Sequence, residues 1–490
     1  MYYYLTLYSN TITPLLTIIL MFFLIIILVI FPNFLKISIK NYFNNFKVIF
    51  MLLLLCSLLC FLIKFIVSFF INNTTYITNY VYSQQFNYCY LIPANNVFSD
   101  IIIILCIVTT FISWIYLSER YLFFNYFSVI YFFIFIVFTA NMVYTNNLMT
   151  MFIFFEFIFL PSLYFVYYLG YAKKVDKTIK YLLVWTLSGS FLVLCSILYL
   201  YSITKTLLIS NYMWIQFSEF EKNLLFLGFM VGFGVKLPLW PFHYWLTKVH
   251  VEAPTGFSIF LSGYLVKTAF FCLSYFIYYF MTTTLHYVFL TIIFWGAIDA
   301  SIRMWTATDI KRLIAFATIQ EMNLIVGLLL LLNNSYLTIL NLFLLVHGVL
   351  SAFLFFLVDQ VQKRYQTRNL VTLSGLAYKF PVLHKIIWFS ILIFRGFPLF
   401  VKFFIEWELL SLLIVNFNMI GFFVFVLITV YGVIGFSRIW LSILYGQPSI
   451  ELTKSTDIIK VDLYVAYMLV IILFVLSFCI YLFNGWCFVL

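Results

Sequence analysis

The most informative residue in this sequence is a lysine in the middle of a hydrophobic run. Lys236 lies in the apolar stretch 224–246, which reads LLFLGFMVGFGVKLPLWPFHYWL. A charge at mid-depth in a bilayer costs about 2.5–3.5 kcal/mol on insertion scales, so a lysine there is expected to serve ion or proton transfer. Pro238 and Pro241 remove backbone donors and predict a broken helix. Because non-helical backbone at membrane depth survives only inside protein or beside water, this segment predicts a transport site.

A glutamate in another apolar run is the natural partner of this lysine. Glu156 lies in MFIFFEFIFLP, and its charge is opposite to that of Lys236. Burial disfavours both charged forms and pairing favours them, so a lysine held between these influences can release a proton when its partner moves away. The alternative is a static ion pair that joins two helices. The neighbouring helix break favours the proton switch.

Five further ionisable side chains lie within apolar runs. They are Lys267 in LSGYLVKTAFF, Glu321 in IQEMNLIV, His347 in FLLVHGVLSAF, and Lys402 and Glu406 in FVKFFIEWELL. Lys267 could pass a proton onward from Lys236, and a histidine titrates near neutral pH. Glu406 is the natural terminal site of such a row. The structural alternatives are snorkelling for the lysine and hydrogen-bonded packing for the histidine.

The composition indicates that these runs are membrane spans. Of the 490 residues, 65% are hydrophobic and 9% are charged. Since about 20 apolar residues span a bilayer, we expect an all-α polytopic membrane protein with about fourteen spans. They lie near 14–31, 48–71, 99–117, 121–141, 148–169, 181–201, 224–246, 255–279, 285–304, 312–332, 335–358, 384–415, 416–444 and 462–485.

The charges in the loops support this number of spans. Of the 27 lysines and arginines, 19 fall in odd-numbered loops and only Lys205 and Lys222 fall in even ones. Inner loops carry the positive excess, so odd loops are predicted inside and both termini outside. The net charge of +11 then reports membrane topology, and nucleic acid is not an expected partner.

The cysteines and the aromatic residues give two weaker indications. The eight cysteines are scattered and form no CxxC pair, which predicts no disulfide framework, zinc site or iron–sulfur cluster. The 63 phenylalanines and 37 tyrosines suggest an AT-rich coding genome, as many organelle genomes have.

A second helix break is predicted in the twelfth span, where Gly396 and Pro398 interrupt the apolar run. The two broken spans are five apart, so spans 4–8 and 9–13 are predicted to form two five-helix repeats that are inverted in the membrane. This organisation divides the chain into N-terminal helices at 1–120, a first repeat at 121–280, a second repeat at 281–445 and a C-terminal helix at 446–490.

Several segments resemble the antiporter-like subunits of respiratory NADH:ubiquinone oxidoreductase (complex I). The run GFGVKLPLWPFHYWLTKVHVEAPTGFS is similar to the family's seventh-span signature, and FFEFIFLPSLYF is similar to its fifth-span glutamate segment. TDIKRLIAFATIQEMNLIVG, VHGVLSAFLFF and GFPLFVKFFIEWELL resemble its tenth-, eleventh- and twelfth-span segments. The resemblance covers about residues 100–420.

This resemblance implies roles for the buried charges. Glu156 and Lys236 match the family's input pair, Lys267 its central lysine, His347 its eleventh-span histidine and Glu406 its terminal glutamate. The family couples quinone reduction elsewhere in the complex to proton pumping, which implies a translocase subunit. FMN, iron–sulfur clusters, NADH and ubiquinone are then expected on other subunits and no cofactor on this chain.

The resemblance also implies a location and partners. The form HVEAP at 250–254 is typical of the subunit 4 branch. That branch implies the mitochondrial inner membrane, with both termini on the intermembrane-space side, and contacts with antiporter-like subunits 2 and 5 and with lipids such as cardiolipin. One alternative is a free-standing multisubunit cation/proton antiporter, against which HVEAP and Glu406 argue. The other is a scaffold without transport, against which the broken spans and the lysine row argue.

Three charges depart from the family's pattern. Glu321 replaces the family's tenth-span histidine, and Lys402 stands where a neutral residue such as asparagine is usual. Arg395 adds another uncommon charge close to the second break. We expect Lys402 or Arg395 to offset the extra negative charge of Glu321. Lys402 also precedes Glu406 by four residues, a spacing that allows the two to pair on one helix face.

Overall fold

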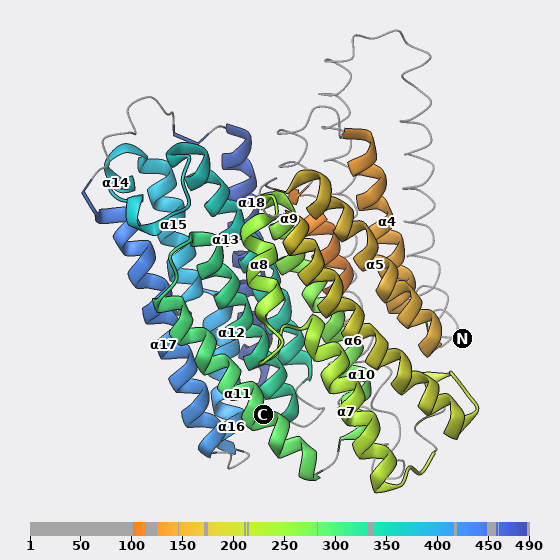
Figure 1. Cartoon of the computed structure of the whole chain (residues 1–490). Coiled ribbons are helices and arrows are strands. Elements are labelled where there is room, and N and C mark those ends of the chain that lie inside the picture. The colour runs from red at the N-terminus through yellow and green to blue at the C-terminus, as the bar shows by residue number, and fades with distance from the viewer. Residues whose placement is uncertain are drawn as a thin grey trace, which may run out of the picture.

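The described part of the chain is a bundle of long helices that run roughly side by side (Figure 1). The computed structural model describes residues 101–110, 112–113, 125–145, 147–170, 175–209, 212, 215–281, 283–331, 337–415, 419–447, 457–458 and 460–487. Within these ranges, seven helices are long and apolar enough to cross a membrane, and shorter apolar helices accompany them. The predicted spans at 14–31 and 48–71 lie outside the described residues, so the total of fourteen stays a prediction.

The helices of the first half follow the predicted spans. They are α4 (Asn125–Tyr144), α5 (Leu148–Leu169), α6 (Val175–Thr204), α7 (Glu219–Lys236), α8 (Tyr244–Glu252), α9 (Thr255–Phe260), the π-helical turn η3 (Leu261–Leu265) and α10 (Val266–Phe280). α7 begins with a capping box in which Ser218 and Glu221 satisfy each other's backbone donors. The segments α9, η3 and α10 follow one another without a gap and form one span.

The helices of the second half also follow the predicted spans. They are α11 (Thr283–Trp305), α12 (Ile310–Leu331), α13 (Leu337–Tyr365), η5 (Leu370–Thr372), α14 (Leu376–Lys379), α15 (Pro381–Phe394), α16 (Val401–Val415), α17 (Met419–Tyr445) and α18 (Lys460–Cys487). The predicted end of α13 at residue 358 is wrong, because the helix continues to Tyr365. Its last turn carries Lys363 and Arg364, whose positive charges suit the negative end of the helix dipole.

Both predicted helix breaks are present. α7 ends at Lys236 and α8 begins at Tyr244, with the two prolines between them. α15 ends at Phe394 and α16 begins at Val401, with Gly396 in the left-handed conformation between them. Each break therefore has a lysine beside it, since Lys402 is the second residue of α16. The boundaries of the two inverted repeats stay a prediction.

Three spans are enclosed by the rest of the bundle. The spanning segments of α9–η3–α10 and of α12 are completely buried and that of α13 is 94% buried, whereas the other long spans are only 33–44% buried. The outer helices α6, α11 and α17 expose large apolar side chains such as Phe191, Trp295 and Ile420. In Figure 1, α12 and α13 lie between the first-half helices and the group of α15, α16 and α17. The bundle thus has an apolar exterior suited to lipid and an interior in which buried polar groups must find partners.

Candidate proton-transfer site

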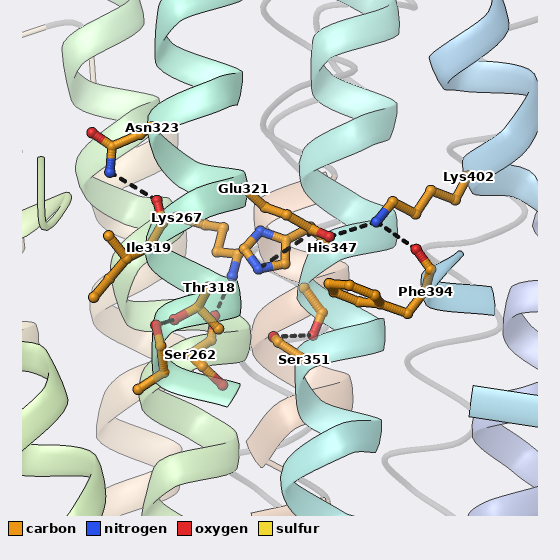
Figure 2. Close-up of polar contacts among 12 residues, drawn as sticks. Ser262, Lys267, Thr318, Ile319, Glu321, Asn323, His347, Ser351, Phe394 and Lys402 are labelled. Atoms are coloured by element: carbon orange, nitrogen blue, oxygen red, sulfur yellow. Dashed lines mark hydrogen bonds and ion pairs between the residues drawn. The ribbon is translucent and has the colours of Figure 1, made fainter. Parts of the chain in front are cut away.

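The predicted ionisable residues form a row that runs across the bundle. Figure 2 shows Lys267 of α10, His347 of α13, Glu321 of α12 and Lys402 of α16 at a similar height along their helices. All four side chains are buried, and three of them come from the enclosed spans. At one end of the row, α10 packs against α7, which carries Lys236. At the other end, Glu406 follows Lys402 on α16.

The predicted Glu156–Lys236 pair is confirmed as a direct ion pair. Lys236 Nζ donates to Glu156 Oε1 at 2.5 Å. The same ammonium lies 4.0 Å from the ring centre of Phe155 and 4.3 Å from that of Phe159, so two aromatic faces also stabilise its charge. The side chain of Lys236 is fully buried, whereas that of Glu156 is 26% exposed. The carboxylate therefore reaches the surface of the chain and the ammonium does not.

The broken backbone behind Lys236 is held by two side chains that compensate for the missing helical hydrogen bonds. Trp245 Nε1 donates to the carbonyl oxygen of Val235 at 2.8 Å. Asn323 of α12 accepts from the backbone nitrogen of Trp240 at 3.3 Å and donates to the carbonyl oxygen of Pro238 at 3.4 Å. The sequence reasoning missed Asn323, although an asparagine inside the apolar run IQEMNLIVG is a signal for an interhelical hydrogen bond.

The π-helical turn η3 determines which way Lys267 points. Lys267 Nζ donates to the backbone carbonyl of Ser262. A π turn inserts one extra residue relative to an α-helix, so residue 267 rather than 266 continues the face that carries Thr255, Ser258 and Ser262. Such turns are frequent at functional sites. Lys267 is thereby placed at the end of a polar face of its own span.

Lys402 lies at the centre of a buried cluster. Its ammonium donates to Glu321 Oε1 at 2.6 Å and to the carbonyl oxygen of Phe394 at 2.9 Å, and it lies 3.7 Å from Glu406 Oε1. The expected contact between Lys402 and the extra acid Glu321 is present. Arg395, the other candidate for this contact, makes no ion pair with Glu321 in the described part of the chain. The cluster thus contains two carboxylates that share one lysine.

His347 connects this cluster to Lys267. Its Nε2 lies 3.9 Å from Glu321 Oε2, and neither ring nitrogen has a hydrogen-bond partner among the described residues. Figure 2 shows the imidazole between the side chains of Lys267 and Lys402. An imidazole in this place can accept a proton at one nitrogen and release it from the other.

Basic residues of the second half hold the end of α8 next to the path. Lys311 Nζ donates to the carbonyl oxygen of Ala253 at 2.7 Å, and Arg368 donates to that of Val251 at 2.5 Å. Cations at this position also interact favourably with the helix dipole. These contacts explain why the HVEAP segment and the TDIKR segment lie together.

Among the residues described, no group of histidine, cysteine or acidic side chains could hold a metal ion.

Comparison with known sequences identifies close relatives. A family profile described as "NADH:quinone oxidoreductase/Mrp antiporter, TM" matches residues 145–435. The NADH-ubiquinone oxidoreductase chain 4 of Paramecium tetraurelia is 34% identical over 76% of this chain and 79% of the relative. The chain 4 of Acanthamoeba castellanii is 30% identical over 72% of each protein. The NADH-quinone oxidoreductase subunit M of Rickettsia bellii is 28% identical over 65% of this chain and 64% of the relative.

Comparison with solved structures indicates the same fold. A chain of the Mrp complex from a Dietzia species superposes with a TM-score of 0.68 at 17% identity, covering 79% of this chain and 81% of that one. A chain of respiratory complex I from Thermus thermophilus superposes with a TM-score of 0.65 at 19% identity, covering 79% of this chain and 80% of that one. The profile spans more than half of the sequence, and the residues 145–435 that it matches contain the whole row of buried charges from Glu156 to Glu406. This chain therefore belongs to the NADH:quinone oxidoreductase/Mrp antiporter transmembrane family, and its curated relatives include NADH-ubiquinone oxidoreductase chain 4 proteins.

Proposed function

We propose that this chain is a proton-translocating membrane-arm subunit of NADH:ubiquinone oxidoreductase. The observation that supports this function best is the row of buried ionisable groups that runs from the Glu156–Lys236 pair to Glu406. A structural role alone does not require such a row, because buried ion pairs are often no more stabilising than apolar packing. A static scaffold also does not require a lysine beside each of two helix breaks.

The first step of the proposed mechanism is a change in the Glu156–Lys236 pair. Quinone reduction elsewhere in the complex supplies the free energy. When Glu156 moves away from Lys236, the buried ammonium loses its main stabilising charge and releases its proton toward Lys267. Return of Glu156 restores the preference for a charged Lys236, which then takes up a proton from the inner side of the membrane, where the positively charged loops lie.

The later steps carry the proton through the central cluster to the other side. His347 lies close enough to Glu321 to exchange a proton with it through a small side-chain movement. The shared ammonium of Lys402 lets Glu321 and Glu406 hold unequal charge, because it can move closer to either carboxylate. Glu406 is 19% exposed in this pair and is the proposed site of release.

We further propose the surroundings of the subunit. It lies in the mitochondrial inner membrane with both termini on the intermembrane-space side, next to antiporter-like subunits 2 and 5 and to lipids such as cardiolipin. FMN, the iron–sulfur clusters, NADH and ubiquinone bind other subunits, and this chain binds no redox cofactor. The 1–120 and 446–490 segments flank two inverted repeats at 121–280 and 281–445.

The position of the terminal carboxylate depends on Gly396. Its φ is +66°, and a Cβ added there would lie 2.8 Å from Glu406 Oε2. We expect Gly396→Ala to displace the Glu406 carboxylate, to lower the number of protons pumped per NADH, and to cost about 1–2 kcal/mol of stability through the left-handed backbone. Proton uptake by membrane vesicles, followed with a pH-sensitive dye, measures this ratio. Phe397→Ala, at the exposed next position, is the matched control and should pump normally; an equal ratio in the two variants contradicts the role of Gly396.

The experiment that tests the proposed function is separation of membranes solubilised in mild detergent on a native gel. The gel is stained for NADH dehydrogenase activity, and peptides of this chain are sought by mass spectrometry. We expect the chain in the large NADH-active band. If it migrates apart from that activity, the complex I assignment fails and the free-standing cation/proton antiporter becomes the better function. The similarity of the fold to a chain of an Mrp complex makes that outcome worth testing with sodium- and pH-gradient assays.

A further inference from the structure

A second buried charge cluster lies at the inner end of α13, away from the row described above. Lys363 Nζ lies 3.2 Å from Asp359 Oδ2 on the same helix and 3.5 Å from Asp462 Oδ2 on α18. Gln360 donates to Asp462 at 2.9 Å, and Thr255 Oγ1 donates to Asp359 Oδ1 at 2.5 Å. Asp359 is fully buried, whereas the side chain of Lys363 is 28% exposed. The cluster therefore joins the surface on the positive-loop side to a carboxylate inside the bundle.

Two polar rows lead from this cluster toward the middle of the membrane. One is the face of α9–η3–α10 that carries Thr255, Ser258 and Ser262 and ends at Lys267. The other follows α13 through Asp359, Ser351 and His347, with the ring of Phe355 between Asp359 and Ser351 at the same four-residue spacing. α13 packs against both α9 and η3, and the Thr255–Asp359 hydrogen bond joins the two rows at one end. Figure 2 shows Ser262 and Ser351 near Lys267 and His347 at the far end of these rows.

A buried histidine lies between the two ends of these rows. His250 of α8 is fully buried and stacks on Phe355, with ring centres 4.6 Å apart. Ser258 Oγ donates to the backbone carbonyl of His250 at 3.4 Å, which places the histidine beside the α9 row as well. Neither of its ring nitrogens has a hydrogen-bond partner among the described residues. Buried polar atoms without a partner are uncommon in a folded interior, and they suit a group that exchanges protons or binds transient water.

From these contacts we propose that Asp359 is the carboxylate that collects protons on the positive-loop side and supplies them to Lys267 between α13 and α9–η3. This proposal rests on the proposed function, since it adds an uptake site to that path. The carboxylate of Asp359 accepts a proton from water at the inner surface. The proton leaves Asp359 along the Thr255, His250 and Ser262 side of the rows and binds the neutral amine of Lys267 after that amine has passed the proton received from Lys236 to His347. Lys267 then returns the new proton to Lys236 when Glu156 comes back. No electron moves, and one proton enters for each proton passed on.

The charges around Asp359 suit this role. Lys363 and Arg364 of α13 are the nearby cations, and Asp462 of α18 is the nearby acid. Because Lys363 is shared with Asp462, it can remain paired when Asp359 takes up a proton. Thr255 donates to the carboxylate and can turn its hydroxyl to accept from the protonated form. The cluster can thus stay intact in both protonation states of Asp359.

The experiment measures proton pumping and NADH oxidation by vesicles that contain the assembled complex with Asp359→Asn. An amide keeps the shape of the side chain but cannot carry the proton. We expect coupled pumping to fall by at least about a hundredfold at alkaline pH, the lower range for loss of a positioned proton-transfer group. The loss should shrink at acidic pH, where protons reach Lys267 without collection, and added formate should partly restore pumping. Asp359→Glu should pump nearly as the native complex does.

A control variant and a second test variant separate this role from a structural one. Asp299→Asn is the matched variant, because Asp299 also pairs with a basic residue, Arg303, at 2.8 Å near the same side of the membrane but outside the rows. It should pump normally at every pH. If Asp359→Asn does not assemble, Thr255→Val keeps the carboxylate and removes its hydroxyl link, and we expect the same loss at alkaline pH with a smaller amplitude.

The outcomes also separate this proposal from the proposed function. Native pumping by assembled Asp359→Asn or Thr255→Val at all pH values, in a complex that loses pumping on Lys236→Ala, overturns the Asp359 proposal alone. A loss that neither acidic pH nor formate relieves also overturns it, since that result indicates a structural defect. If Lys236→Ala itself pumps normally, the proposed function is wrong as well.

Discussion

Replacing Lys236 with alanine should abolish coupled proton pumping while leaving assembly of the complex largely intact. Lys236 is the fully buried member of the proposed input pair, and no other described cation contacts Glu156. Its removal takes away the group that holds the proton, and we expect pumping to fall by at least about a hundredfold, the lower range for a positioned proton-transfer group. Assembly should survive because the side chain of Glu156 is 26% exposed, so removal of Lys236 does not leave a fully buried carboxylate without a partner.

The measurement is the initial rate of acidification per NADH oxidised in vesicles, with the amount of complex determined on a native gel. Lys222→Ala is the matched control, because it removes a lysine from the first turn of the same helix α7, far from the break. This control should pump at the native rate. Full pumping by assembled Lys236→Ala would sink the assignment of the path, and failure of both variants to assemble would show that α7 tolerates no loss of charge.

Breaking the Glu321–Lys402 pair should have the second-largest effect, and changing both partners to the residues usual in the family should reverse much of it. Lys402→Asn leaves the carboxylates of Glu321 and Glu406 buried without their shared cation. Removing one partner of a buried pair costs about 3–5 kcal/mol. Glu321→His should be milder, because Lys402 keeps Glu406 at 3.7 Å. The double variant Glu321→His with Lys402→Asn should assemble and pump better than Lys402→Asn alone.

The amount of assembled complex and its proton-to-NADH ratio are the two measurements for this series. Arg303→Asn serves as the control, because Arg303 and Asp299 form an i,i+4 ion pair in which the arginine side chain is 48% exposed. Loss of such an exposed pair costs only about 0–1 kcal/mol. Should both single changes prove harmless and the double change bring no improvement, the idea that Lys402 compensates for Glu321 is wrong.

The two pairs have a common arrangement. Lys236 ends α7 at the first break and pairs with a glutamate of α5 at 2.5 Å. Lys402 begins α16 after the second break and pairs with a glutamate of α12 at 2.6 Å. In each predicted repeat, the broken span thus contributes a lysine to a glutamate of the span that lies two earlier. The additional charges that depart from the family's pattern give this chain a second glutamate–lysine pair beside the second break.

Much of the fold was predictable because its signals are local. About 20 apolar residues identify a membrane span wherever they occur, and a proline removes a backbone donor whatever surrounds it. The bounds of α5 agree with the predicted span at 148–169, and both predicted breaks are present. Charges inside apolar runs are also easy to recognise in a sequence, because placing a charge in a bilayer costs free energy and is therefore rare. For this reason the sequence predicted seven buried charges as candidate site residues before their positions were known: Glu156, Lys236, Lys267, Glu321, His347, Lys402 and Glu406.

The hydrophobicity pattern predicted a span that is too short where the helix continues beyond its apolar run. The predicted end of the eleventh span at 358 excluded Asp359 by one residue, although α13 continues to Tyr365 and Asp359 is fully buried. Its burial comes from Thr255, Lys363 and the neighbouring α18, and none of these contacts is visible in a window of hydropathy. A charged residue at the end of an apolar run is therefore assigned to a loop unless the packing of other helices is known.

Within the described residues, what the sequence determined by itself is where the apolar helices lie, the two breaks and the list of charges that had to be buried. Only the tertiary structure decided which of these charged side chains contact one another. The four-residue spacing of Lys402 and Glu406 predicted a pair, and they lie 3.7 Å apart, but the closer partner at 2.6 Å is Glu321 on another helix. The same is true of Asn323, which holds the broken backbone of a span far away in sequence. A local pattern fixes the face of a helix on which a side chain lies, whereas the rotation of that helix against its neighbours depends on the packing of the whole bundle.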